Sequence, residues 1–461
     1  MIVKLAMRTL FAHPIRSAVL AAGFGSGVAV MAILLGVAEI VLLQARSPDL
    51  VGGGNVLISG ADGRLTSARV LLAGPLGTPP LSERIIAASP WRREALYLVN
   101  DAGITPVRAT AGIPSRERLS NDPEVSDKAA WVDAPGDAHW VAPDPADVAR
   151  SIDRFHDIPD VPARAHSWAE WLYFNGRAAN ARFYLTFLVG PATPAGRRTA
   201  GVRLQLDRGA GLESFTATEE IEPSAVARAP ELSIAGNHIR LTGLRYQISL
   251  NLVNASGTRV TGNLVIEGEP GRVLPPIEVS GAAGWRSGYV VPVMSGTLDG
   301  TLQVGGATVA FDNGAGYHDH NWGFWEGVSW QWGQAQHGDV SLIYGRIFPP
   351  RDAADPDFMP GFLGMLGPDG PIGYATNITI TERNAAGSAV PAEITIAARS
   401  RSLDLTLKFT VEHVATNRLP GPIAGAMDFL QMRGRYEVSG RARGQTVAFD
   451  TPGSAETFRA R

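Results

Sequence analysis

The sequence contains no cysteine, and lysine occurs only three times, at Lys4, Lys128 and Lys408. The absence of cysteine excludes disulfides, thiolate metal sites, a cysteine nucleophile and a lipid-modified cysteine. The formal net charge is only −3, so the composition gives no reason to expect nucleic acid as a partner. No β-α-β rhythm and no phosphate-cradling glycine loop is found. A chain of 461 residues is nevertheless long enough for two or three domains.

Long apolar runs are also missing, with one exception near the N-terminus. Residues 17–38 carry no charged side chain, and about 20 such residues suffice to cross a bilayer as a helix. Lys4, Arg8 and Arg16 precede this run, which predicts a cytoplasmic N-terminus and an extracytoplasmic remainder at a bacterial-type inner membrane. We expect residues 1–48 to form a retained single-pass anchor. A cleaved signal peptide is the alternative interpretation.

The region from residue 49 to residue 160 is mixed in composition. It predicts a turn leading into a strand at 56–60, a second strand at 95–99 and a short helix at 146–155 that starts after a proline. Between residues 122 and 147 the chain is rich in Asp, Pro and Ala, which is typical of a linker or an irregular cap. We therefore expect 49–160 to be an extracytoplasmic linker or cap, without assigning its fold.

The rest of the chain shows a two-residue alternation of apolar and polar side chains, which is typical of strands with one buried face. The alternation is clearest at 183–189, 202–206, 246–252 and 403–411. Glycine occurs 52 times and proline 32 times, spread along the chain as turn punctuation. This pattern favours an all-β fold made of an antiparallel sandwich or barrel.

One stretch is unusually rich in chemistry, the sequence Gly-Tyr-His-Asp-His-Asn-Trp-Gly at 316–323. In an extended strand the side chains alternate between two faces. One face carries Tyr317, Asp319 and Asn321, and the other carries His318, His320 and Trp322. A carboxyl in an aromatic, apolar pocket has a raised pKa and can act as a general acid, and neighbouring rings stabilise a resulting carbocation.

Two other interpretations of this stretch remain. The two histidines form an H-x-H pair that can place both imidazoles on one metal, with His337 or Asp339 completing the set. No third ligand has a characteristic spacing, so we expect no metal. The stretch can also be a structural corner, in which glycines turn the chain and polar groups tie loops together.

A second aromatic segment, Trp168-Ala-Glu-Trp-Leu-Tyr-Phe-Asn-Gly, opens the β region. On a strand Trp168 and Glu170 share one face, while Trp171 and Tyr173 share the other. These rings either seal the end of a barrel, with Glu170 paired to an arginine, or line an apolar pocket. The aromatic cluster that contains Trp330 and Trp332 follows the motif at 316–323.

The two motifs together resemble the paired signatures of the carotenoid 1,2-hydratase (hydroxyneurosporene synthase) family, whose wider group includes attachment-related lipocalin-like proteins encoded beside ABC exporters. The resemblance covers roughly residues 165–461. It implies two tandem lipocalin-like antiparallel β-barrels, here at 161–322 and 323–461. The N-terminal membrane helix predicted from the apolar run precedes them and is a departure from the family. The segment at 8–17 also loosely resembles the first membrane segment of ABC-exporter permeases.

The resemblance implies a cofactor-free hydro-lyase reaction, in which an acid protonates a terminal isoprenoid double bond and water captures the cation. By motif match Asp319 is the proton donor and Tyr317 its neighbour. The predicted lining of the substrate site is Trp168, Trp171, Tyr173, His318, His320, Asn321, Trp322, Trp330 and Trp332. We expect a lipophilic, isoprenoid-type ligand and hydration or cyclisation. The alternatives are a non-catalytic lipophile carrier or accessory protein with ABC transporter subunits as partners, and a purely structural envelope module.

Overall fold

The computed structural model describes residues 12, 14–15, 56–59, 65, 68–74, 76–77, 81–100, 103–122, 125, 130–178, 181–209, 211–368, 370–418 and 427–460. They fall into two compact units, one within residues 1–65 and 86–137 and the other within residues 66–85 and 138–461. The predicted membrane helix at 17–38 lies outside the described residues. Among those that are described, no helix combines the length and apolar character needed to cross a bilayer.

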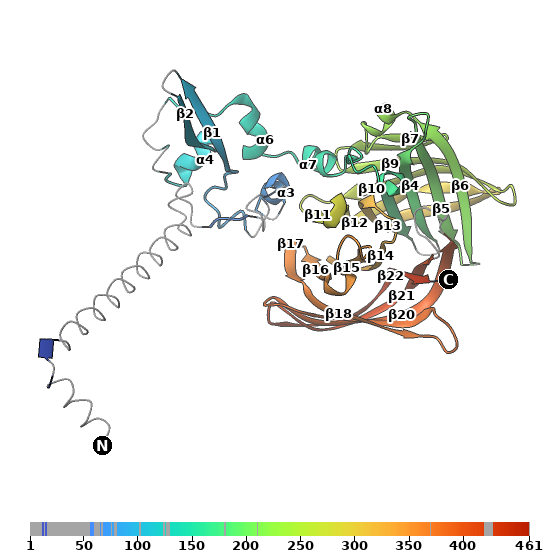
Figure 1. The fold of residues 1–461 in the computed structure, drawn as a ribbon. Coiled ribbons are helices and arrows are strands. Elements are labelled where there is room, and N and C mark those ends of the chain that lie inside the picture. The colour runs from blue at the N-terminus through green and yellow to red at the C-terminus, as the bar shows by residue number, and fades with distance from the viewer. Residues whose placement is uncertain are drawn as a thin grey trace. The chain divides into compact units, whose positions relative to one another are not determined.

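Strands dominate the described part of the chain, as the alternation predicts (Figure 1). The helices there are α3 (Ala68–Ala73), α4 (Pro114–Leu119), α6 (Ala138–Val141), α7 (Pro145–Ile152) and α8 (Pro223–Val226). Single 3-10 turns lie at Pro135–Asp137, Ala165–Ser167, Ala282–Gly284 and Pro356–Phe358.

The smaller unit contains a two-stranded antiparallel hairpin of β1 (Arg92–Asn100) and β2 (Gly103–Ala111), followed by α4. The strand expected at 95–99 lies within β1. The strand expected at 56–60 is not found, because residues 56–59 have no strand partner and are exposed. Apolar side chains there have no facing sheet to cover them.

The larger unit begins with an antiparallel sheet that closes into a barrel. Its strands are β3 (Trp168–Arg177), β4 (Arg182–Ala192), β5 (Arg198–Asp207), β6 (Leu212–Ile221), β7 (Leu232–Ile234), β8 (Asn237–Thr242), β9 (Arg245–Asn254), β10 (Arg259–Gly268), β11 (Leu274–Ser280), β12 (Arg286–Val304) and β13 (Ala307–Phe324). Eight of them follow the order β10-β12-β13-β3-β4-β5-β6-β9, and pairing of β9 with β10 closes the ring. Gly305 and Gly306 both have positive φ, which permits the tight turn that joins β12 to β13.

The interior of this barrel is filled by side chains. An eight-stranded barrel is only wide enough for side chains or one small ligand. Its large buried rings are Phe174, Phe183, Phe187, Phe215, Phe311 and Tyr246. They pack with aliphatic residues of β4, β5, β9 and β10 in one cluster. The barrel therefore acts as a solid scaffold for the strands on its surface.

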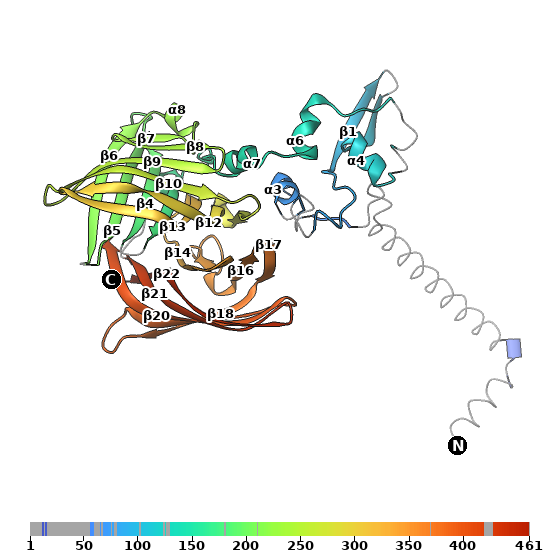
Figure 2. The ribbon, with the colours of Figure 1, turned by 180° about the vertical axis from the view of Figure 1, so that it is seen from behind.

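A second antiparallel sheet has nine strands and stays open as a half-barrel, whereas the sequence predicts a second closed barrel. Its strands are β14 (Ser329–His337), β15 (Val340–Phe348), β16 (Phe362–Gly367), β17 (Gly370–Ala375), β18 (Asn377–Asn384), β19 (Pro391–Arg399), β20 (Leu403–Arg418), β21 (Met427–Ala442) and β22 (Gln445–Ala460). The edges of this sheet are β17 and β18. Both views of the molecule show it lying against the first barrel, in orange and red (Figures 1 and 2).

Helix α7 covers one end of the first barrel. Asp144 caps it by accepting a hydrogen bond from the backbone of Ala146 at 2.8 Å, and Pro145 occupies the first turn. The buried residues Val148, Ala149 and Ile152 form one face of the helix and pack into the clusters beneath. This packing sets Asp153, the residue after the helix, at the end of the barrel, where it is fully buried.

Candidate functional site

Strand β13 divides the motif at 316–323 between two interiors. In its antiparallel pairing with β3, Asp319 faces Tyr173 and Tyr317 faces Asn175, while His318 faces Phe174. Directly paired residues project to the same side of a sheet. Tyr317 and Asp319 therefore point out of the barrel toward the second sheet, and His318 points into the barrel. This is the separation that the alternation predicts.

Asp319 lies between the two sheets and is only 3% exposed. Its Oδ2 accepts a hydrogen bond from the Tyr317 hydroxyl at 3.0 Å, and its Oδ1 accepts one from Asn321 Nδ2 at 2.7 Å. Burial raises the pKa of Asp319 well above its usual range, and the charge of Glu456 raises it further. The two hydrogen bonds lower the pKa but do not offset burial. Burial thus favours the protonated form of this carboxyl more than in an exposed aspartate.

A chain of hydrogen bonds leads from the second sheet to this carboxyl. Trp332 Nε1, on β14, donates to the Tyr289 hydroxyl at 2.8 Å. The Tyr289 and Tyr317 hydroxyls are also 2.8 Å apart, and Tyr317 contacts Asp319. Because Tyr317 gives its single hydroxyl hydrogen to Asp319, Tyr289 must donate to Tyr317, and the chain of hydrogen bonds ends at the Asp319 carboxyl.

A second carboxyl, Glu456 on β22, approaches the same region from the facing sheet. Trp330 Nε1 donates to its Oε2 at 3.2 Å, and Gln431 Nε2 donates to its Oε1 at 3.2 Å. Burial raises the pKa of Glu456 to about 7, although hydrogen bonds from Trp330, Gln431 and Tyr173 lower it. Gln431 also donates to the Tyr173 hydroxyl at 3.0 Å, so it joins the two sheets.

Rings and aliphatic side chains surround these polar groups. The cluster between the sheets contains Tyr173, Tyr184, Leu274, Val291, Met294, Tyr317, Trp332, Ile343 and Leu366, with Trp171, Tyr289, Trp330 and Phe362 packed against it. Trp332 packs edge-on against both Tyr173 and Tyr317, with ring centres 6.2 and 5.6 Å away. The ring centres of Trp171 and Trp330 are 6.0 Å apart. Rings of this kind favour a cation that forms beside them.

Three buried polar atoms in this region have no hydrogen-bond partner among the described residues. They are Nδ2 of Asn175, the hydroxyl of Tyr184 and Oε1 of Gln431. Buried polar groups are normally satisfied, and each unsatisfied one costs on the order of 1–3 kcal/mol. The region between the sheets therefore holds polar atoms with unused hydrogen-bonding capacity.

The opposite face of β13 carries a separate network inside the barrel end. His318 contacts Asp153 Oδ2 through Nε2 at 3.0 Å and the Tyr173 carbonyl through Nδ1 at 3.0 Å. His320 contacts Asp153 Oδ1 through Nδ1 at 3.0 Å and Glu170 Oε1 through Nε2 at 2.9 Å. Tyr246 donates to Asp153 Oδ2 at 2.8 Å.

The charges in this network stabilise one another. Burial by itself would raise the pKa of Asp153, but His318 and His320 lower it to about 2. Burial by itself would lower the pKa of His320, but hydrogen bonds and charges from Asp153 and Glu170 raise it to about 9. Burial acts to raise the pKa of Glu170, and its histidine neighbours bring it below the ordinary value. The partners of Glu170 are histidines, not the arginine expected from the sequence.

The other predicted residues divide between these regions. Trp168 and Trp322 pack with Trp285 and Phe324 at the barrel end, away from Asp319. The motif histidines face the filled interior, so they and these two tryptophans do not line the space between the sheets. Asn321, Tyr173, Trp171, Trp330 and Trp332 do lie there. His337 and Asp339, proposed from sequence as further metal ligands, are exposed beside the turn from β14 to β15.

Five further residues of these networks are not indicated by any sequence pattern described above: Glu456, Tyr289, Gln431, Asp153 and His156. Glu456 lies in a strand that also carries Asp450, and an acid in a strand normally faces solvent. Asp153 lies 165 residues before His318 in the chain, and His156 lies similarly far before His320, so only the fold reveals their contact. The excess of histidine and acid near the cap was the one signal that could have found them.

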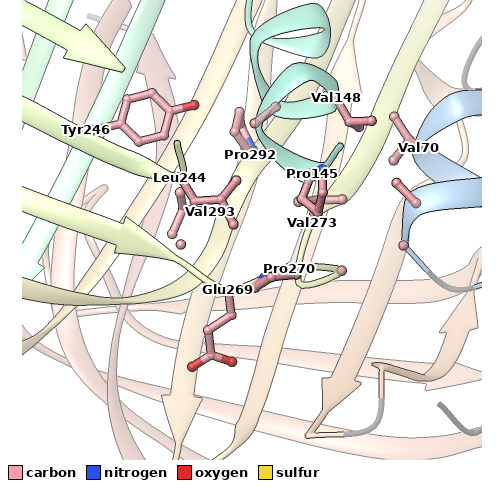
Figure 3. Close-up of a pocket in the computed structure, with 15 residues that line it drawn as sticks. Val70, Pro145, Val148, Leu244, Tyr246, Glu269, Pro270, Val273, Pro292 and Val293 are labelled. Atoms are coloured by element: carbon pink, nitrogen blue, oxygen red, sulfur yellow. The ribbon is translucent and has the colours of Figure 1, made fainter. Parts of the chain in front are cut away.

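A small pocket lies where α7 and α3 meet the barrel. It is lined by Val70, Val148, Leu244, Tyr246, Val293 and neighbouring residues (Figure 3). Its volume is ≈ 20 Å³, room for about one water molecule. This pocket is therefore too small for an isoprenoid chain.

No protein-family model matches the chain, and no curated protein matches it in sequence. Among solved structures, a protein of Nitrosomonas europaea named as a candidate AttH matches with 11% identity and a TM-score of 0.42, covering 66% of this chain and 96% of that one. Kievitone hydratase from Nectria haematococca matches with 13% identity and a TM-score of 0.43, covering 64% and 89%. CghA matches with 11% identity and a TM-score of 0.43, covering 64% and 88%. Similarity at this level does not establish an activity for this chain.

Proposed function

We propose that the protein binds a lipophilic, isoprenoid-type molecule between its two sheets and that Asp319 protonates one of its carbon–carbon double bonds. The observation that carries this proposal is a buried carboxyl with a raised pKa, surrounded by aromatic rings at the boundary between the sheets. The unpartnered atoms of Asn175, Tyr184 and Gln431 favour a ligand that also carries an oxygen function. Because side chains fill the barrel interior, the proposal places the ligand at the boundary between the sheets, beside Asp319.

The proposed step needs no redox partner. The Asp319 carboxylic acid gives its proton to one alkene carbon, the π bond breaks, and a tertiary carbocation forms on the other carbon. In hydration, a water oxygen bonds to the cation and its surplus proton returns to the Asp319 carboxylate. In cyclisation, the π electrons of a second double bond form a carbon–carbon bond to the cation instead, and the positive charge moves to the other carbon of that double bond. The Asp319 carboxylate then takes a proton from a carbon next to the new cation, and the electrons of that C–H bond form a new double bond. Tyr317 and Asn321 hold the carboxylate between these two proton transfers.

The test compares Asp319→Asn with wild type on acyclic carotenoid and prenyl substrates, measured as product formation. Loss of a general acid lowers turnover by about 10²–10⁴-fold. Asp312→Asn is the matched control, because Asp312 lies on the same strand and is exposed. Turnover by Asp319→Asn equal to that of Asp312→Asn would remove Asp319 from the reaction. A lipophile that co-purifies with wild type but is never converted would favour the carrier function.

We also propose, from the sequence alone, that residues 17–38 anchor the protein with its sheets outside the cytoplasm. This location would let the site receive a lipophile from the bilayer or from an ABC exporter. Alkaline phosphatase fused after Arg461 gives the test, since the enzyme is active only outside the cytoplasm. An inactive fusion of normal abundance would contradict the proposal.

A further inference from the structure

Three potential metal ligands meet at the end of the first barrel, on the side of β13 that does not carry Asp319. They are His156 in the segment after α7, Glu170 on β3 and His320 on β13, and their ligand atoms all lie within 4.8 Å of one another. His156 Nδ1 is 2.7 Å and His320 Nε2 is 2.9 Å from the same oxygen, Glu170 Oε1. Three segments far apart in the sequence thus bring two imidazole nitrogens and a carboxylate oxygen close together, where they could bind one metal ion.

We propose that His156, Glu170 and His320 form a binding site for a divalent metal of the zinc class. Two imidazoles and one carboxylate are a donor set that zinc takes in proteins, usually with water in the fourth position. Tetrahedral bonds of about 2.0–2.2 Å place the donors roughly 3.3 Å apart, so the two short separations must open by only about half an ångström. A cation would then replace the proton that His320 Nε2 shares with Glu170.

The surroundings orient the ligands as metal sites require. Metal-binding histidines usually donate their second ring N–H to a carboxylate. His320 meets this condition, since its Nδ1 contacts Asp153 Oδ1 at 3.0 Å. The ring of His156 stacks on Trp322, with centres 4.2 Å apart, and its backbone N–H donates to Glu170. Asp153 and Glu170 supply two negative charges that balance a divalent cation.

Exposure of the three ligands determines what the metal would do. Glu170 and His320 are fully buried, while the His156 side chain is 34% exposed and gives solvent a route to an open position. The metal would link His156, in the segment after α7, to Glu170 and His320 on the barrel. It would therefore hold this segment against the barrel end. His318 is not among the ligands, because its nitrogens contact the Tyr173 carbonyl and Asp153. The proposed ligand set therefore differs from the H-x-H pair of His318 and His320 that the sequence suggests.

The experiment uses the full-length chain, stripped of metal by a chelator and titrated with Zn²⁺ by calorimetry. Bound metal is counted by mass spectrometry after dialysis. We expect one Zn²⁺ per chain, together with an absorption spectrum of four-coordinate cobalt when Co²⁺ replaces zinc. His156→Ala should weaken binding at least tenfold. His166→Ala is the control, because His166 lies in the same cap segment, is exposed and contacts Glu326 through its ring.

Circular dichroism of the metal-free variants checks that they fold, and Glu170→Gln provides a second ligand variant. Zinc should raise the unfolding temperature of wild type and of His166→Ala but not that of His156→Ala. Less than stoichiometric binding by wild type, or equal affinity in His156→Ala and His166→Ala, would overturn the proposal. If both ligand variants fail to fold, the wild-type stoichiometry and the cobalt spectrum decide. None of these measurements depends on catalytic activity.

Discussion

Trp332 on the second sheet donates a hydrogen bond to the Tyr289 hydroxyl on the first barrel at 2.8 Å. This contact begins the chain that ends at Asp319, so the packing of the two sheets is coupled to the surroundings of the carboxyl. Replacing Trp332 by Phe, Tyr289 by Phe, and both together forms a double-mutant cycle. We expect a coupling free energy of about 1 kcal/mol in denaturant unfolding. Additive effects within about 0.3 kcal/mol would show that the bond contributes nothing.

Tyr317→Phe removes the hydroxyl that donates to Asp319 Oδ2. That hydrogen bond lowers the pKa of Asp319, so its loss moves the pKa further up. The acid then stays protonated to higher pH, and the alkaline fall in kcat/KM should shift upward in the pH profile. Tyr374→Phe, an exposed position on β17, should leave the profile unchanged. A downward shift for Tyr317→Phe would contradict the assigned direction of the hydrogen bond.

Glu456→Gln should alter how stability depends on pH. Burial raises the pKa of Glu456 from its ordinary value of 4.5 to about 7 in the folded protein, so the folded state holds this proton more tightly. The stability contributed by this group is complete below pH 4.5 and is lost as pH rises through about 7. The difference corresponds to at most ~3 kcal/mol. Unfolding free energies at pH 5 and pH 8 should therefore differ less in Glu456→Gln than in wild type.

The control for this change is Glu437→Gln on the neighbouring strand β21, where the side chain is exposed. Its pH dependence should follow that of wild type. Parallel curves for wild type and Glu456→Gln would mean that Glu456 is solvated like an ordinary surface acid.

Gly288→Ala should destabilise the barrel end. Gly288 on β12 pairs directly with Trp322, and a Cβ there would overlap the indole ring. We expect a loss of about 2–3 kcal/mol in unfolding free energy. At Gly201 on β5 an added Cβ makes only ordinary contacts at 3.5 Å, so Gly201→Ala should be neutral or slightly stabilising. Equal stability of the two variants would show that the indole can move away at little cost.

Sequence alone predicts the local pattern well. Residues 183–189, 202–206 and 246–252 lie within β4, β5 and β9, and the helix expected after Pro145 begins there as α7. The two faces of the motif around Asp319 also follow from alternation. These features depend on neighbours in the chain, whose side chains point to alternate sides at every second position.

Features that depend on distant strands are not predicted. Alternation indicates which face of a strand is buried, but not whether β17 and β18 meet, so the open edge of the second sheet was missed. The sequence pattern of β22 predicts that Glu456 is an exposed acid. In the structure it is largely buried, because β22 packs against the first barrel. The role of Asp153 as the partner of His318 and His320 becomes visible only in the folded protein, where the end of α7 lies beside the two histidines. In each case the deciding contact joins segments far apart in the chain.

The burial of β13 on both sides has a consequence for how this protein tolerates change. A strand at a protein surface usually has one face on which substitutions are neutral. Between Gly316 and His320 every residue is buried, and successive side chains belong to different interiors. A substitution in this stretch must therefore disturb either the space between the sheets or the barrel end. In a library of single substitutions these positions should accept the fewest alternatives in the chain.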